Sequence, residues 1–136
     1  MTLRVPGQIR DAMVVHARNC VPEEACGLLA GDPGGGSLRM AYPLTNRDHS
    51  PVRYTIEPEE HFRAWKHAER CGWELVGAFH SHPTSAAVPS SIDVGRAYEP
   101  DWTYVIVGLS DPSRPEIRAF RIADGMADEI PVVLEG

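Results

Sequence analysis

Several features are missing from this sequence, and each absence narrows the possible functions. No apolar run of its 136 residues approaches the ~20 residues that a membrane-spanning helix needs. The segment MTLRVPGQIRDAMVV lacks the long apolar stretch and cleavage site of a secretory signal, so we expect a cytoplasmic protein without a membrane partner. Basic residues are few, since 13 Lys and Arg stand against 19 Asp and Glu, giving a net charge of −6. This balance argues against a nucleic-acid partner, which requires clustered positive charge.

Cysteine is scarce as well. The three cysteines are Cys20, Cys26 and Cys71, and no C-x-x-C pair occurs. The odd count and the spacing argue against a disulfide scaffold and against a cysteine zinc site. We expect free thiols in a reducing compartment, with a Cys20–Cys26 pair left open.

The remaining composition is that of an ordinary globular protein, with 43% hydrophobic and 24% charged residues, and the length suits one domain over residues 1–136. The glycine-rich segment GDPGGGS (31–37) is expected to form a hairpin tip. Apolar spacing and turn residues predict helices over 7–19, 58–71 and 90–98. They predict strands over 3–5, 26–30, 38–44, 52–56, 74–81, 102–109 and 116–123, and a last strand ending near 133. This order predicts an α/β fold, with a mixed sheet flanked by helices.

The segment GAFHSHPTSAAVPSSID (77–93) combines a strand end, a loop and a helix start. Alternate residues of a strand point to one face with Cα atoms ~6.6 Å apart, so His80 and His82 could bind one metal ion together. Asp93, at the head of the next helix, could supply a third ligand and leave the fourth position open for water, as in catalytic zinc sites. Two histidines and one carboxylate also suit ferrous iron. Alternatively, Ser90 and Asp93 form a helix capping box. The two readings are compatible, because Asp93 could bind metal with one carboxylate oxygen and accept the capping hydrogen bond with the other.

The pattern H-x-H-P, six residues, S-x-x-D resembles the JAMM motif of the MPN+ (Mov34/MPN/PAD-1) metalloproteases. The upstream EEACGLLAG is similar to the family's E-x-C-G-L-L-x-G, and the glutamate that fits is Glu24 rather than Glu23. Residues 44–83 also resemble the small standalone bacterial members. The resemblance implies an MPN/JAB1 architecture, which is related to that of cytidine deaminases.

For the site, the resemblance implies one Zn²⁺ per chain, held by His80, His82 and Asp93. It further implies that Glu24 acts as the general base for a zinc-activated water, and that Ser90 donates a hydrogen bond to the oxyanion. Ser91 is the rival to Ser90 as a pure helix cap.

For the substrate, the resemblance implies hydrolysis of a peptide or isopeptide bond at the C-terminal Gly-Gly of a ubiquitin-like protein, in small bacterial members a sulfur carrier. One alternative is a general or cell-wall or phage-type peptidase on the same fold. Another is a non-catalytic MPN interaction module, against which the presence of all five chemical residues argues. A zinc deaminase would need H-x-E and P-C-x-x-C, which this chain lacks.

Overall fold

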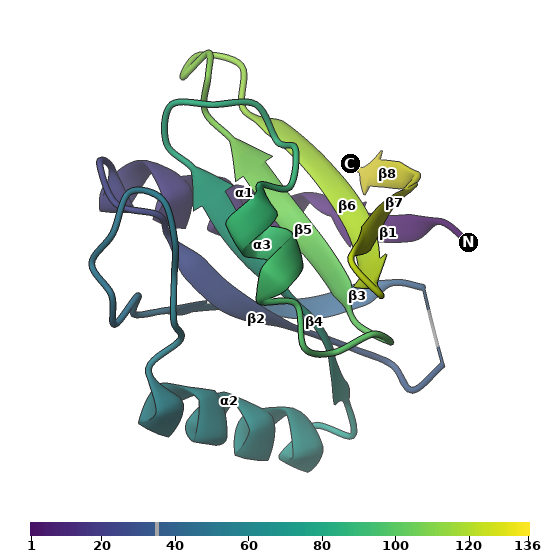
Figure 1. The fold of residues 1–136 in the computed structure, drawn as a ribbon. Coiled ribbons are helices and arrows are strands. Elements are labelled where there is room, and N and C mark those ends of the chain that lie inside the picture. The colour runs from purple at the N-terminus through teal and green to yellow at the C-terminus, as the bar shows by residue number, and fades with distance from the viewer. Residues whose placement is uncertain (35) are drawn as a thin grey trace.

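The computed structural model describes residues 1–34 and 36–136, and Figure 1 shows the arrangement of its elements. The described helices are α1 (Gly7–Cys20), α2 (Pro58–Arg70) and α3 (Ser91–Gly95). The described strands are β1 (Leu3–Pro6), β2 (Cys26–Gly31), β3 (Leu38–Leu44), β4 (Glu74–His82), β5 (Thr103–Gly108), β6 (Glu116–Ala123), β7 (Met126–Ile130) and β8 (Val132–Glu135).

Six strands form one mixed sheet in the order β3-β2-β4-β5-β6-β7. The β4–β5 pair is parallel, and the other neighbours in this sheet are antiparallel. A separate two-stranded sheet joins β1 and β8 in parallel. The prediction of a mixed sheet flanked by helices is therefore confirmed.

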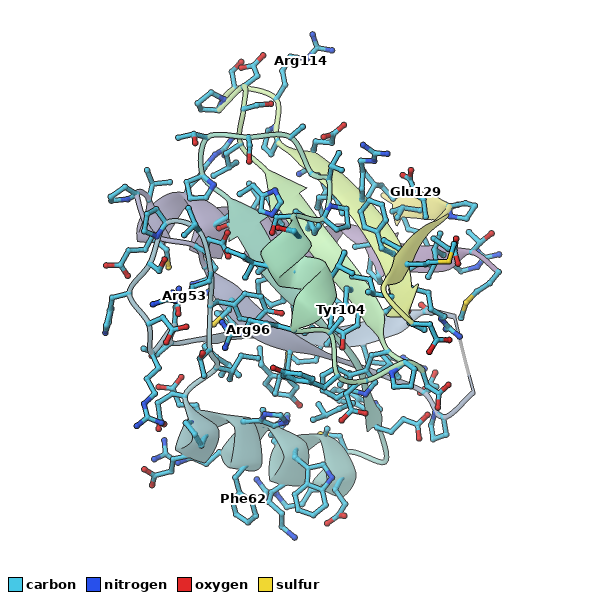
Figure 2. The ribbon with its side chains drawn as sticks, viewed as in Figure 1. Arg53, Phe62, Arg96, Tyr104, Arg114 and Glu129 are labelled. Carbon is cyan, nitrogen blue, oxygen red and sulfur yellow. The ribbon has the colours of Figure 1, made fainter. Side chains whose placement is uncertain are left out.

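The large sheet has an apolar layer on each face. One layer includes residues of α1, β1 and β8 with Val105 and Val107 of β5, whereas the other includes Tyr104 and Ile106 with residues of α2 and α3. This division follows from the alternation of side chains along β5. In Figure 1, α3 lies across the middle of the sheet and α2 lies at its lower end, and Figure 2 shows Phe62 pointing from α2 away from the sheet.

Two strand predictions are wrong. Residues 52–56 form no strand and contribute only an isolated bridge between Asn46 and Ile56. The buried Asn46 side chain organises this segment instead, because its amide donates to the Arg53 carbonyl and its oxygen accepts from the Asp48 and Thr55 backbone N–H groups. The last strand is also not continuous, because β7 ends at Ile130 and β8 leaves the large sheet to pair with β1.

The other local predictions have simpler outcomes. The antiparallel β2–β3 pair confirms the hairpin around the glycine-rich tip, although Gly35 lies outside the described residues. All three cysteines are free thiols, so the Cys20–Cys26 pair is not formed. Within the described ranges, no helix combines the length and the apolar character needed to cross a membrane.

Candidate active site

The sheet register brings Glu24 to the two histidines. In the antiparallel β2–β4 pair, Cys26 lies opposite His80, and continuing this register places Glu24 opposite His82. The N–H of Ser81 donates to the Ala25 carbonyl at 3.0 Å, which supports the continued pairing. Because side chains alternate, Glu24, His80 and His82 all face the α3 side of the sheet.

The imidazole rings and Asp93 converge on one point. The Nε2 atoms of His80 and His82 lie 3.2 Å apart. The Asp93 carboxylate lies 3.2 Å from His80 Nε2 through Oδ1 and 3.0 Å from His82 Nε2 through Oδ2. All three residues are buried, with exposed fractions of 3%, 6% and 8%. The structure thus brings together the two histidines and the aspartate of the sequence motif.

These three residues fit a zinc ion. Ligands of a tetrahedral zinc at 2.0–2.1 Å are separated from each other by about 3.3 Å. The two Nε2 atoms lie 3.2 Å apart, and each has one oxygen of the Asp93 carboxylate at 3.0–3.2 Å. Two buried polar atoms of the site, His80 Nδ1 and Glu24 Oε1, also have no hydrogen-bond partner among the described residues. The donor set of two imidazoles and a carboxylate is one that zinc and ferrous iron both accept.

The loop after β4 orients His82. Its Nδ1 lies 2.8 Å from the carbonyl oxygen of Ala86, so Nδ1 carries the proton and Nε2 faces the site. Burial by itself lowers the pKa of His82, but the hydrogen bonds to Asp93 and Ala86 outweigh burial and raise this pKa above its usual value. Asp93 therefore favours the protonated form of His82 when no metal is bound.

Asp93 also takes part in a helix cap. Ser90 is the N-cap of α3, because its Oγ accepts from the Asp93 N–H at 3.1 Å and its own N–H donates to Asp93 Oδ2 at 2.9 Å. The cap is therefore Ser90, and the expectation of Ser91 as the rival cap is wrong. Burial alone would raise the pKa of Asp93, but the hydrogen bonds with His80 and His82 lower it well below its ordinary value. Asp93 therefore stays ionised while it serves both the cap and the histidines.

Glu24 brings a second carboxylate to the histidines. One of its oxygens lies within 4.8 Å of a ring nitrogen of both His80 and His82, and the residue is 3% exposed. Burial, together with the charge of Asp93, raises the pKa of Glu24 to about 8. Its backbone is fixed, since its N–H donates to the Ser50 carbonyl at 2.8 Å and its carbonyl accepts from Asn46 Nδ2 at 3.1 Å. Glu24 is a candidate ligand by position, but Asp93 makes the closer contacts.

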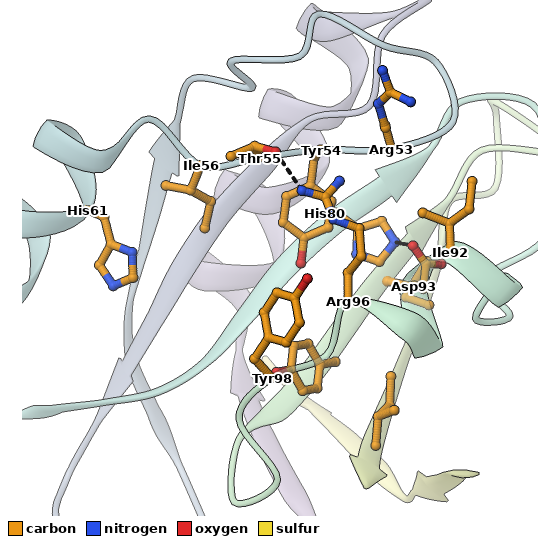
Figure 3. A pocket seen from close by; sticks show the side chains of 13 residues that line it. Arg53, Tyr54, Thr55, Ile56, His61, His80, Ile92, Asp93, Arg96 and Tyr98 are labelled. Carbon is orange, nitrogen blue, oxygen red and sulfur yellow. Dashed lines mark hydrogen bonds and ion pairs between the residues drawn. The ribbon is translucent and has the colours of Figure 1, made fainter. Parts of the chain in front are cut away.

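A cavity of about 200 Å³ opens beside His80 and Asp93 (Figure 3). The ring of Tyr54 stacks on the His80 ring, with centroids 4.8 Å apart and planes inclined by 27°. Arg53 and Arg96 also line the cavity. These three residues lie outside the motif, and no local sequence pattern marks them as part of a site.

The four histidines outside the motif have other partners. His16 Nε2 lies 3.0 Å from the carbonyl oxygens of Cys26 and Leu44, so this ring bridges β2 and β3. His67 lies 2.7 Å from the Tyr42 hydroxyl through Nδ1, and His49 pairs with Glu23 at 3.2 Å. His61 lies beside Trp102, with ring centroids 6.4 Å apart.

Comparison with known proteins gives a consistent family assignment. The family described as "Prokaryotic homologs of the JAB domain" matches residues 6–123. A "CysO-cysteine peptidase" from Mycobacterium tuberculosis is 41% identical over 130 residues, which cover 96% of this chain and 89% of that protein. A "Desampylase" from Haloferax volcanii is 38% identical over 109 residues, which cover 76% of this chain and 78% of the relative.

Solved structures agree with this assignment. The solution structure of a protein from Desulfitobacterium hafniense superimposes with a TM-score of 0.90 at 36% identity, covering 99% of this chain and 93% of that one. A JAB1/MPN domain protein from Archaeoglobus fulgidus superimposes with a TM-score of 0.61 at 18% identity, covering 97% and 98% of the two chains. The expected MPN/JAB1 architecture is confirmed by this second similarity, which concerns the fold alone.

Proposed function

This chain belongs to the prokaryotic homologues of the JAB domain. From this membership we propose that it is a zinc-dependent peptidase acting on ubiquitin-like carrier proteins. The proposed reaction is hydrolysis of the bond after the C-terminal Gly-Gly of a sulfur-carrier protein. The observation that carries the proposal is the convergence of Glu24, His80, His82 and Asp93 at one end of β2 and β4.

In this proposal His80, His82 and Asp93 hold one zinc ion per chain. When bound, zinc lowers the pKa of a coordinated water and polarises a carbonyl oxygen. His82 presents Nε2 because Ala86 holds its Nδ1 proton, and Asp93 is aimed by the backbone N–H of Ser90. These contacts hold the ligand side chains in position without metal, which reduces the free-energy cost of ordering them when metal binds.

Glu24 is the proposed general base. A base acts on its proton directly or through one water, and a Glu24 carboxylate oxygen lies within 4.8 Å of a ring nitrogen of each histidine, which is near enough for either route. Glu24 accepts a proton from the attacking water and passes it to the leaving amine. Because water is the nucleophile, no covalent acyl-enzyme forms.

Ser90 is the proposed oxyanion donor. Its Oγ accepts the Asp93 N–H, which leaves the hydroxyl hydrogen available to donate to a developing negative charge. Because the same residue caps α3, the hydroxyl is held at a fixed place near the ligands. Capping and catalysis are therefore compatible roles for Ser90.

The proposed substrate follows from the relatives and from a groove at the start of β4, the end of this strand opposite to His80 and His82. Phe62 and Trp65 of α2 are exposed large side chains at a groove that also contains Trp73 and Trp102. The groove includes Glu69, Glu74 and Glu99, so its acidic edge suits a carrier whose apolar patch is surrounded by basic residues. A Gly-Gly tail suits the site because glycine allows the backbone to approach closely. We place this reaction in the cytoplasm, where three free thiols are stable.

The test compares Glu24→Gln with Glu23→Gln, which removes the neighbouring exposed carboxylate paired with His49. The substrate is a ubiquitin-like carrier extended by one residue beyond its Gly-Gly. We expect cleavage by wild type and Glu23→Gln, near-complete loss in Glu24→Gln, and about one zinc per chain in all three. Equal activity of Glu24→Gln would remove Glu24 from the mechanism, and a folded wild type that binds no metal would contradict the zinc site. Cleavage of unstructured peptides alone would support the general peptidase instead.

A further inference from the structure

His80 lacks the hydrogen bond that usually orients a metal-binding imidazole. A ligating histidine normally donates its second ring N–H to a carbonyl or a carboxylate, which sets the orientation of the ring. His82 has such a partner, because its Nδ1 lies 2.8 Å from the Ala86 carbonyl oxygen. The buried Nδ1 of His80 has no hydrogen-bond partner among the described residues. Any restraint on the plane of the His80 ring must therefore come from another contact, because the last side-chain torsion of histidine is broad when nothing restrains it.

Tyr54 supplies a contact of the required kind. Its ring is stacked on the His80 ring, with the centroids 4.8 Å apart and the planes inclined by 27°. Figure 3 shows the two side chains next to each other in the cavity that both of them line. This stack restricts rotation about the last torsion of His80, because turning the imidazole would drive its edge into the phenol ring. The stack thus keeps His80 Nε2 directed at Asp93 Oδ1, which lies 3.2 Å away.

The backbone on both sides of Tyr54 is anchored by hydrogen bonds. Asn46 Nδ2 donates to the Arg53 carbonyl at 3.0 Å, and Asn46 Oδ1 accepts from the Thr55 N–H at 3.2 Å. Thr55 is also held through its side chain, since its Oγ1 accepts from Arg96 Nη2 at 2.7 Å. Arg96 directly follows α3, the helix that supplies the third proposed ligand. Tyr54 is therefore tied to the elements of the site, so its ring can serve as a rigid support.

We propose that Tyr54 is a positioning residue of the metal site, and that the face of its ring holds His80 in the orientation that binds the ion. This inference rests on the proposed function, because His80 is one of the three proposed zinc ligands. It goes beyond that function by assigning the orientation of a ligand to a residue outside the motif. Tyr54 contacts the ligand rather than the ion, so it acts through His80.

The ring of Tyr54, rather than its hydroxyl group, carries this role. Stacking uses the face of the aromatic ring, which phenylalanine shares with tyrosine. Leucine is apolar and bulky but has no planar face, so it fills space without restraining the imidazole. A purely space-filling role would be served by leucine, whereas a positioning role would not. Tyr54→Phe and Tyr54→Leu therefore separate the two roles.

The test measures the affinity for Zn²⁺ alone, by competition with a chelator, on metal-free proteins whose folding is checked by circular dichroism. We expect Tyr54→Phe to bind Zn²⁺ within about twofold of wild type and Tyr54→Leu to bind it about tenfold more weakly, as for loss of one contact that orients a metal ligand. The visible spectrum of the Co²⁺-loaded protein should be unchanged in Tyr54→Phe and altered in Tyr54→Leu. Tyr54→Met, which also lacks a planar face, should behave like Tyr54→Leu and takes its place if the leucine variant does not fold.

The matched control is Tyr98→Leu, which makes the same substitution at a tyrosine that lines the same cavity but is 77% exposed. It should keep the wild-type affinity for Zn²⁺ and the wild-type Co²⁺ spectrum. Wild-type affinity in Tyr54→Leu, or equally weakened binding in Tyr54→Phe and Tyr54→Leu, would overturn the inference while leaving the zinc site in place. A folded wild type that binds no Zn²⁺ would instead overturn the proposed function and the inference with it.

Discussion

Replacing Ser81 with alanine should disturb Glu24, the proposed general base, without removing a proposed metal ligand. Ser81 lies between the two histidines on β4, but its side chain faces the opposite side of the sheet and is fully buried. Its Oγ accepts the Ala25 N–H at 2.8 Å, while its own N–H donates to the Ala25 carbonyl. These two bonds hold the peptide next to Glu24 against the end of β4.

The size of the effect follows from the lost hydrogen bond. Alanine would leave the Ala25 N–H buried without a partner, which costs about 1–3 kcal/mol. At about 4 °C per kcal/mol for a chain of this length, the unfolding midpoint should fall by about 4–12 °C. A shift of Glu24 by about 1 Å could lower kcat up to about a hundredfold, with little change in KM. Zinc content should stay at one ion per chain, because the imidazoles are not touched.

Thermal unfolding, metal analysis and steady-state kinetics on the extended carrier would measure these three quantities. Ser113→Ala is the matched control, since Ser113 is exposed and its hydroxyl bonds only the neighbouring Asp111 in the described structure. A Ser81→Ala protein with both the wild-type midpoint and the wild-type kcat would contradict the assigned role of Ser81. Loss of zinc would show instead that Ser81 supports the ligands rather than the base.

Two further changes have expected outcomes. Burial raises the pKa of Glu24 from 4.5 to about 8, so the metal-free protein should lose stability as pH rises from about 4.5 through about 8. Thermal unfolding of metal-free Glu24→Gln should lack that part of the pH dependence. Identical plots of midpoint against pH for wild type and Glu24→Gln would contradict this prediction. Gly27→Ala should cost about 3 kcal/mol or more, because a methyl group there overlaps the Tyr42 carbonyl and the Phe79 ring. Denaturant unfolding should show Gly95→Ala to be nearly neutral, because no described residue outside the helix's own turn lies within 4 Å of the added carbon.

The proximity of the motif residues could be predicted from sequence because it depends on strand alternation and local spacing. His80 and His82 point together since they are two residues apart in a strand, and Asp93 reaches them from the first turn of the next helix. The position of Glu24 required the family resemblance. Nothing in the local sequence shows that β2 pairs with β4 rather than with β3 alone, because that pairing is long-range.

The segment over residues 46–56 could not be predicted in the same way. Its β-forming residues favour a strand, but β propensity depends on finding a partner strand. Here the Asn46 amide and carbonyl satisfy four backbone groups, those of Glu24, Arg53, Asp48 and Thr55, and this network takes the place of a ladder. The same network places Tyr54 against His80 and Thr55 against Arg96, so the cavity depends on contacts that no periodicity encodes.

The pairing of β2 with β4 links the folding of the chain to metal binding. Between these neighbouring strands the sequence inserts β3 and α2, so Glu24 can face the histidines only after a large loop has closed. An ion that binds the assembled centre and not the open chain stabilises the closed form by mass action, about 2.7 kcal/mol when free metal is a hundredfold above its Kd. The abundance of folded protein would then follow the free metal concentration in the cell, and metal limitation would deplete the protein itself as well as its activity.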